Sequence, residues 1–281
     1  MMFFFKRAEL EAMSKKLSHE FQNAEPFQHV VIDDFLPLDV ANRVASEFSS
    51  VNKQSWRLAG PGDSKHTDDP DVEKISMSDE EGFPDSIRQL MHSMQSGIFI
   101  RFIERLTGYR HLNADPHNFG CGLHSTGRGG RLMLHVDASR HPNKDFHQLI
   151  NLIYYCTPDW KDQYGGHLEL WDKDAKQCVK SVAPTFNRAV IFYTGRYSYH
   201  GHPQPVTCPS GMRRNSMALY FYTTKKEQSD IKHSNYVEWK AVTEHDQRSL
   251  YHSAKNIVRK VLPRRAVNNL ATFVRQIRKR L

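Results

Sequence analysis

The sequence predicts a mainly β fold, of the sandwich or jelly-roll type, with flanking helices. After Gly108, short apolar runs recur between turn-forming Gly, Pro, Asn and Asp residues, a spacing typical of such β folds. Before Gly108, longer segments repeat apolar residues with the helical period. With 281 residues, 39% of them hydrophobic, the chain can bury a sizeable core as one large domain or two small ones. The predicted strands are 132–136, 148–156, 167–171, 179–182, 189–193 and 217–222.

The first hundred residues predict helices around one short strand, with one polar interruption. Residues 51–83 are polar and punctuated by Pro and Gly, so we expect a long surface excursion there. Long loops in compact domains are usually functional or disordered, which makes this segment a candidate lid or specificity element. The elements predicted around it are a mixed-charge helix at 7–21, a short buried strand at 29–32, a helix at 37–48, and a helical segment at 84–106 with a break near Gly97.

The positive charge is concentrated at the C-terminal end of the sequence. The net charge is +8, but residues 251–281 hold nine basic and no acidic side chains, which leaves residues 1–250 at −1. We therefore expect no nucleic-acid binding by the main domain. The basic segment 252–281 predicts either a contact with a membrane surface or polyanion, or a terminal helix packed by its apolar face with its charges in water.

Cysteine usage and hydropathy favour a cytoplasmic protein with reduced thiols. The four cysteines form no CxxC pair, so neither a disulfide scaffold nor a Cys-rich zinc site is indicated. No run approaches the roughly 18 apolar residues of a transmembrane helix. Charged residues follow the apolar opening of the sequence at once, which is the reverse of the order in a signal peptide.

The pattern His-x-Asp or His-x-Glu occurs three times. The surrounding sequence must decide which of the three pairs is a candidate for binding a metal. Sixteen histidines make such pairs common by composition alone. The first pair lies in a charged stretch, which predicts a solvated loop. The third pair lies on one face of a strand and would need a further ligand at sensible range. In chain order the pairs are His66 with Asp68, His135 with Asp137, and His167 with Glu169.

The second pair has the best context for a metal. His135 and Asp137 end an apolar strand, where an imidazole and a carboxylate two residues apart can point at one ion. A further imidazole follows in the segment 199–203, which contains His200 and His202. Two imidazoles and one carboxylate that leave coordination positions open suit non-haem Fe(II) reacting with oxygen. Zinc would bind as well, but it has no redox chemistry.

A cation at the start of the last predicted strand could complete a binding site. Arg214 and Ser216 are two residues apart and share one face, while Arg213 points to the opposite face. A guanidinium forms bidentate hydrogen bonds with a carboxylate, and a hydroxyl adds a donor. A buried Arg214 without a carboxylate would be costly, and a dicarboxylate that also chelates the metal would remove that cost. The alternative is an ordinary surface arginine.

A series of segments carries a resemblance to a known family. The segments are 27–48, 120–124, 129–137, 149–155, 159–160, 164–172, 199–203 and 214–222. In this order they resemble the iron(II)/2-oxoglutarate-dependent oxygenases, prolyl-4-hydroxylase-like branch. The likeness covers about residues 25–225. It implies a double-stranded β-helix, a jelly-roll or cupin-like core, over 25–225, with an N-terminal helical segment at 1–24 and a basic helical tail at 226–281.

The resemblance also implies the site and the reaction. His135, Asp137 and His200 would hold Fe(II), and Arg214 would bind the far carboxylate of 2-oxoglutarate with Ser216 beside it. Tyr155 matches a family position that contacts the same carboxylate. With O2 as oxidant and ascorbate as a candidate reductant, a C–H bond of a peptidyl proline or a small molecule would be hydroxylated, with release of succinate and CO2.

Several alternatives stay open at this point. His202 could replace His200 as the distal ligand, although the family places the ligand before the Gly. His124 is either a loop histidine or part of the substrate mouth, and His167 is either structural or on the substrate side. Tyr155 could be a core aromatic. The whole protein could be a catalytically silent metal-binding or interaction protein on the same fold. A zinc hydrolase would leave Arg214 and Ser216 unexplained.

Overall fold

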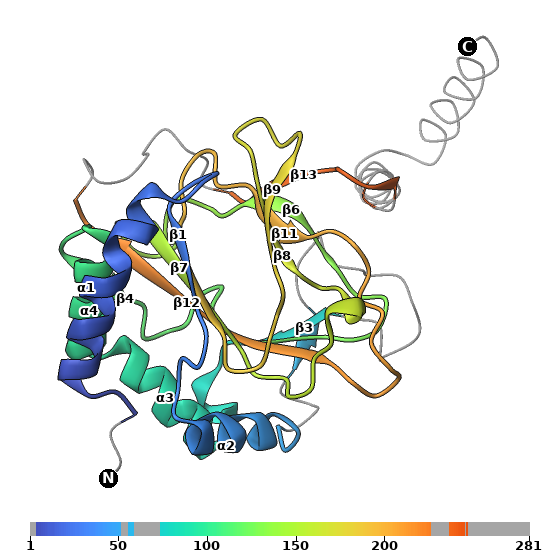
Figure 1. Cartoon of the computed structure of the whole chain (residues 1–281), viewed down its shortest axis with the longest axis horizontal. Helices are drawn as coiled ribbons and strands as arrows, with labels where there is room; N and C mark the ends of the chain where they lie inside the picture. Colours follow the sequence, from blue (N-terminus) through green and yellow to red (C-terminus); the bar gives the residue numbers. More distant parts are fainter. Residues whose placement is uncertain (1–3, 52–55, 59–73, 226–235, 245, 247–281) are drawn as a thin grey trace.

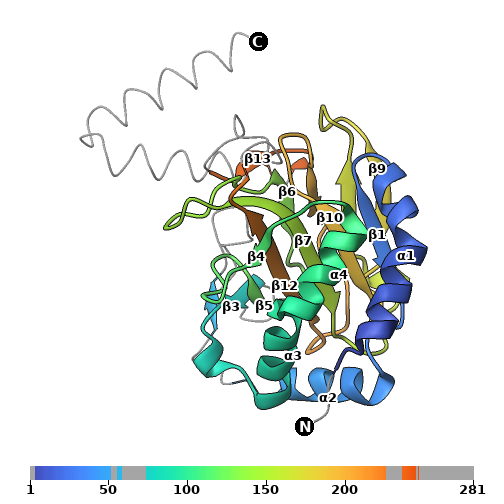
Figure 2. The ribbon, with the colours of Figure 1, turned by 90° about the vertical axis from the view of Figure 1, so that its left-hand side faces the viewer.

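Two antiparallel β-sheets face each other, and four helices cover the outer face of the larger sheet (Figures 1 and 2). The computed structural model describes residues 4–51, 56–58, 74–225, 236–244 and 246. From β5 to β12 the chain passes repeatedly from one sheet to the other, and only β8 and β9 follow each other within one sheet. This arrangement confirms the prediction of a mainly β fold with flanking helices.

In the described residues the larger sheet contains eight strands, of which seven form a continuous order. β4 (Leu112–Ala114) pairs with one of the central strands, β12, outside that order. The continuous order is β1 (His29–Ile32), β10 (Ala189–Tyr193), β7 (His147–Tyr155), β12 (Arg214–Thr223), β5 (Gly122–Thr126), β3 (Lys74–Met77) and β2 (Arg57–Leu58).

The smaller sheet, as far as the chain is described, contains five strands and carries the histidine-rich segments. Its two central pairings join β6 to β11 and β11 to β8, both antiparallel. The order is β13 (Glu238–Lys240), β6 (Leu132–Val136), β11 (His200–His202), β8 (Leu168–Trp171) and β9 (Cys178–Val182).

The helices confirm the predicted break near Gly97. The Ser96 side chain accepts a hydrogen bond from the Phe99 backbone N–H and caps the second helix of the pair, which ends at Gly108 in the left-handed conformation. Two 3-10 turns lie at Glu80–Gly82 and Asp162–Tyr164. The helices are α1 (Arg7–Asn23), α2 (Leu38–Phe48), α3 (Asp85–Gln95) and α4 (Gly97–Thr107).

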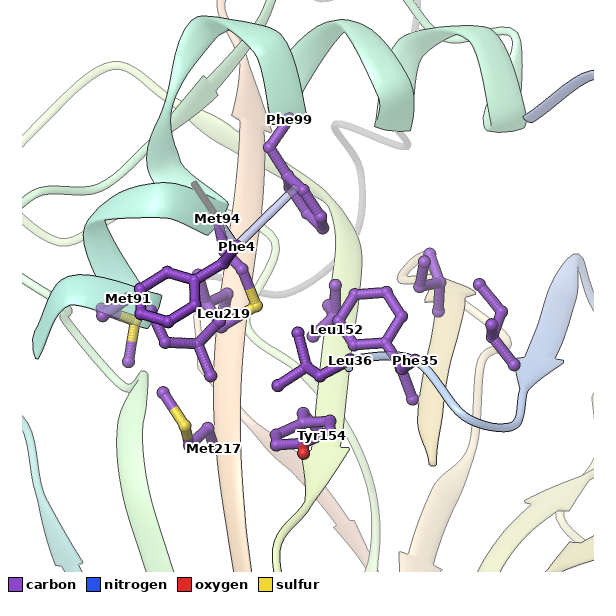
Figure 3. Close-up of a cluster of buried hydrophobic side chains, with 14 of the residues drawn as sticks. Phe4, Phe35, Leu36, Met91, Met94, Phe99, Leu152, Tyr154, Met217 and Leu219 are labelled. Carbon is purple, nitrogen blue, oxygen red and sulfur yellow. The ribbon is translucent and has the colours of Figure 1, made fainter. Parts of the chain in front are cut away.

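The main hydrophobic core lies between the helices and the larger sheet (Figure 3). β12 shows how it is built, because Met217 and Leu219 face the helices while the alternate residues face the other sheet. Phe35, Phe99 and Tyr154 fill the space between these layers. One face of the larger sheet is thus fixed by apolar packing, and its other face is free to carry polar side chains.

Residues 51–83 are only partly the surface excursion that the sequence predicts. The structure places β2 and β3 within this segment, and β3 pairs with β5 at the edge of the larger sheet. Met77 and Phe83 are buried in the core. The polar composition of β3 did not indicate a strand. Half of its residues face the cavity between the sheets, which is lined by polar side chains. Residues 59–73 lie outside the described residues.

The segment predicted to be a helical tail also contributes a strand. β13 pairs with β6 and becomes an edge of the smaller sheet. The basic segment 252–281 and the pair His66 with Asp68 lie outside the described residues. The described part of the chain contains no helix long and apolar enough to span a membrane. The four cysteines are all free.

Candidate metal and cosubstrate site

His135 and His200 face each other across two paired strands of the smaller sheet. They are register partners between β6 and β11, with ring centroids 4.4 Å apart. The register between β11 and β6 shifts after His200. Gly201 fits between the strands because a Cβ there would lie 2.8 Å from the Met133 carbonyl oxygen. The sequence His-Gly-His therefore allows β11 to approach β6 closely enough to bring the two imidazoles together.

Asp137 completes a convergent group immediately after β6. Its Oδ1 lies 3.4 Å from His135 Nε2, and its Oδ2 lies 3.8 Å from His200 Nε2. One donor atom from each residue lies within 4.8 Å of the others, and all three side chains are buried. Among the residues that the structure describes, this is the group of His, Cys, Asp and Glu side chains with the geometry to hold a metal ion.

Hydrogen bonds to the backbone fix which nitrogen of each imidazole faces the group. His135 Nδ1 donates to the Met133 carbonyl and His200 Nδ1 donates to the Ser198 carbonyl, each at 2.9 Å. The Nε2 lone pairs are therefore left for a metal, which is the arrangement found around metal-bound histidines. The donor set and its orientation fit an Fe(II) ion with open coordination positions.

The protonation states suit metal binding at neutral pH. Burial, assisted by the charge of His135, lowers the pKa of His200 to about 4, so this imidazole is neutral at pH 7. Burial opposes ionisation of Asp137, but the neighbouring His200 and His135 outweigh it and hold the pKa of this carboxyl well below its usual range. Gln148 Nε2 and Asn151 Nδ2 donate to Asp137 Oδ2 at 2.9 and 3.3 Å and orient the carboxylate.

Arg214 is buried on the opposing wall, at the start of β12. Its Nε donates to the Gly166 carbonyl at 2.7 Å, and its Nη2 donates to the Tyr155 hydroxyl at 3.3 Å. Gly166 has a positive φ of 69°, and a Cβ there would lie 2.9 Å from Arg214 Cδ, so this position requires glycine. Burial lowers the pKa of the guanidinium. Among the described residues no carboxylate forms an ion pair with Arg214, so the surface alternative for this residue is wrong and its charge faces the interior.

Ser216 and Tyr155 lie beside this guanidinium. They are register partners between β12 and β7, which places both side chains on the inner face of the larger sheet. The Arg214 guanidinium carbon lies 4.9 Å from the centroid of the Tyr155 ring. Tyr155 also packs in a small buried apolar cluster. It is therefore both a core aromatic residue and a partner of Arg214.

A cavity of about 360 Å³ joins the histidine group to the guanidinium. His135, Asp137 and His200 lie on its wall together with Arg214 and Ser216. The remaining lining residues are Lys74, Ser76, Gly120, His124, Leu132, Asn151, Ile153, Leu168, His202, Ala218, Tyr220, Val237 and Trp239. The two halves of the predicted site therefore line the same cavity.

The structure separates the other candidate histidines. His202 and His124 line the cavity but do not belong to the convergent group. His167 lies outside the cavity lining, where Nδ1 contacts Ser181 Oγ at 3.2 Å and Nε2 lies 3.1 Å from Asp162 Oδ1. No sequence pattern indicated Lys74 or Trp239 in the cavity, because they come from β3 and β13, whose pairing with distant strands is not encoded by a local pattern.

The part of the chain that contains this group is similar to a known family. The model of the 2OG-Fe(II) oxygenase superfamily matches residues 121–222, which contain His135, Asp137, His200 and Arg214. Residues 121–222 belong to the 2OG-Fe(II) oxygenase superfamily. The superfamily is named for 2-oxoglutarate and Fe(II), and the geometry described above fits both.

Prolyl hydroxylases are among the 2OG-Fe(II) oxygenases to which this chain is similar. A segment of 55 residues is 40% identical to prolyl 3-hydroxylase OGFOD1 of Mus musculus, which is 18% of this chain and 10% of the length of that protein. A prolyl hydroxylase from Trichoplax adhaerens, solved with a peptide of hypoxia inducible factor, superposes with a TM-score of 0.55 at 19% identity, over 79% of this chain and 93% of that one.

The fold of a 2OG-Fe(II) oxygenase is confirmed by a further structure. A prolyl 4-hydroxylase of Phytophthora capsici superposes with a TM-score of 0.55 at 18% identity, over 90% of this chain and 75% of that chain. The two facing sheets are accordingly the double-stranded β-helix that the sequence resemblance implied.

Proposed function

We propose that this protein is an active Fe(II)- and 2-oxoglutarate-dependent dioxygenase that hydroxylates a C–H bond of its substrate. One observation carries the proposal. A buried His-Asp-His group and a buried guanidinium without a carboxylate partner among the described residues face the same cavity. A dicarboxylic keto acid that binds a metal at one end and Arg214 at the other satisfies both.

Metal binding and 2-oxoglutarate binding would fall to different residues of the cavity. The Nε2 atoms of His135 and His200 and the carboxylate of Asp137 bind Fe(II) and leave adjacent positions open. Arg214 forms charged hydrogen bonds with the far carboxylate of 2-oxoglutarate. Ser216 adds a hydroxyl donor, and Tyr155 holds the guanidinium in place. A bound metal would supply the redox chemistry with O2, and the protein would hold the metal and the cosubstrate in position.

The overall reaction balances without a further protein redox group. One atom of O2 enters the substrate as hydroxyl and the other enters succinate, while 2-oxoglutarate loses CO2. Ascorbate would act as an auxiliary reductant that keeps the metal as Fe(II). The named relatives favour a peptidyl prolyl residue as the position hydroxylated, with a small molecule as the alternative.

The test is production of succinate from 2-oxoglutarate. Protein loaded with Fe(II), in the presence of O2 and ascorbate, should release succinate even without substrate, and a substrate screen should find a compound that accelerates this release. The same assay separates an enzyme from a silent binding protein. If the protein binds Fe(II) and 2-oxoglutarate tightly but releases no more succinate than the metal-free control, it is a catalytically silent binding protein and the proposal is wrong.

A further inference from the structure

His202 is a buried imidazole that the His-Asp-His group does not use. Its side chain is 3% exposed, and neither ring nitrogen has a hydrogen-bond partner among the described residues. It lines the cavity but does not belong to the convergent group. A buried polar group without a partner lowers the free energy of unfolding, so an unpaired imidazole on a cavity wall indicates that a ligand or an ordered water pairs with it.

Strand pairing places His202 toward the end of the cavity that contains Arg214. β11 runs antiparallel to β8, and His200 is the register partner of Leu170. The step from His200 to His202 therefore leads toward the start of β8. Gly166 lies just before that start, and its carbonyl accepts the hydrogen bond from Arg214 Nε. His202 is thus on the side of His200 that leads to the guanidinium.

The spacing along β11 is comparable with the length of the cosubstrate. Two residues of a strand span about 6.6 Å, and His200 and His202 both line the cavity. 2-Oxoglutarate is a five-carbon dicarboxylic acid that would bind the metal through its keto acid end and extend toward Arg214. Its far carboxylate would then lie beside His202 as well as beside Arg214.

The far carboxylate can accept a hydrogen bond from His202 in addition to those from Arg214. The two carboxylate oxygens together offer about four lone-pair sites. Arg214 uses part of its guanidinium on the Gly166 carbonyl and the Tyr155 hydroxyl, at 2.7 and 3.3 Å. Either tautomer of a neutral imidazole presents one N–H, and a hydrogen bond from this N–H to a carboxylate is strengthened by the negative charge. Such a bond would give the buried imidazole of His202 its missing partner.

We propose that His202 donates a hydrogen bond from a ring N–H to the far carboxylate of 2-oxoglutarate. The carboxylate is then held from both walls of the cavity, by Arg214 on the larger sheet and by His202 on the smaller one. This inference rests on the proposed function, because it requires 2-oxoglutarate to extend from the His-Asp-His group to Arg214.

Calorimetry with two keto acids tests the proposal. 2-Oxopentanoate has the same carbon chain and the same metal-binding end as 2-oxoglutarate, but it lacks the far carboxylate. The ratio of the two association constants on anaerobic, Mn(II)-loaded protein therefore reports on recognition of that carboxylate alone. The ratio in wild type tests the proposed function, and the change of the ratio in variants of His202 tests this inference.

Three substitutions separate the N–H group from the shape of the side chain. His202→Leu removes the donor, whereas His202→Asn and His202→Gln place an amide N–H near the positions of Nδ1 and Nε2, respectively. His29→Leu is the matched control, because His29 is a buried histidine of β1 outside the cavity lining. Its Nδ1 bonds to the Phe27 carbonyl. Mn(II) affinity, measured in the same titrations, shows whether each variant keeps the metal site.

The ratio is expected to fall at least about fivefold in His202→Leu and to stay unchanged in His29→Leu. One of the two amide variants should recover part of the lost preference, and Mn(II) affinity should stay within about threefold throughout. A smaller fall in His202→Leu overturns the proposal. So does a failure of both amide variants to exceed His202→Leu, because the shape of the imidazole and not its N–H would then matter. A wild-type ratio near one would contradict the proposed function and this inference with it.

A crystal structure of wild type with Mn(II) and 2-oxoglutarate tests the same contact without any variant. A ring nitrogen of His202 should lie within about 3.2 Å of an oxygen of the far carboxylate. A larger separation, with the carboxylate bound to Arg214, would overturn the inference and leave the proposed function intact.

Discussion

His135 and His200 are direct cross-strand partners in the smaller sheet, with ring centroids 4.4 Å apart and each Nδ1 bonded to the backbone carbonyl two residues earlier. The geometry of the metal site is therefore set by strand register. Since side chains alternate along a strand, a slip of one residue between β6 and β11 would turn one imidazole out of the cavity. The close approach at Gly201 helps to prevent such a slip.

Asp137→Ala should weaken metal binding at least about 100-fold, because it removes the anionic donor and leaves two imidazoles. Gln148 would also lose its acceptor on the carboxylate. Titration of anaerobic protein with Fe(II) or Mn(II) measures the change. Glu169→Ala is the matched control, since Glu169 follows a histidine at the same spacing but bonds to Trp171 Nε1 outside the cavity lining. Equal metal affinity in the two variants would refute the assignment of Asp137.

Arg214→Ala should weaken 2-oxoglutarate binding at least about 30-fold while metal affinity stays within about threefold, because the charged hydrogen bonds to the far carboxylate are lost. Arg213→Ala tests specificity, since the neighbouring Arg213 points to the other face and bonds to Ser125. The measurement is calorimetric titration of the Mn(II)-loaded protein with 2-oxoglutarate. A loss in Arg213→Ala as large as that in Arg214→Ala would contradict the proposed role.

Acid should destabilise the metal-free protein between pH 6.5 and about 4. The unfolded His200 binds a proton near pH 6.5, whereas burial delays this until about pH 4 in the folded state. Protons therefore favour the unfolded state in this window, at a cost on the order of 3 kcal/mol. Urea unfolding at several pH values measures the slope. His200→Gln should reduce this slope but not abolish it, because burial also lowers the pKa of His124, to about 3. His19→Gln, at an exposed position of α1, should leave the slope unchanged. An unchanged slope in His200→Gln would show that the pKa shift is wrong.

Trp239 should report metal binding by fluorescence. Its ring centroid lies 4.9 Å from that of His135, and it lines the cavity. A redox-active ion on His135 is expected to quench this indole, so anaerobic Fe(II) should lower the emission of wild type. Trp239→Phe should lose most of the metal-dependent change. Trp56→Phe should keep it, because Trp56 packs against Phe48 on the helical side. Quenching that persists in Trp239→Phe would place the metal elsewhere.

The sequence predicts those parts of the site whose residues share one strand. His135 with Asp137 and Arg214 with Ser216 are pairs at a spacing of two, so the face they share follows from the backbone. Lys74 and Trp239 have no such signal. They reach the cavity through pairing of β3 with β5 and of β13 with β6, contacts between distant segments of mixed polarity. The strand β11 was also missed, because His-Gly-His has no apolar alternation and is strand only by virtue of its two partners.

Anaerobic visible spectroscopy tests the central claim most directly. When Fe(II) and then 2-oxoglutarate are added to wild-type protein, a weak charge-transfer band should appear only after the second addition, because the keto acid chelates the metal held by His135, Asp137 and His200. The band should be absent from Asp137→Ala. Stoichiometric Fe(II) binding with no band at saturating 2-oxoglutarate, or an unaltered band in Asp137→Ala, would contradict the account.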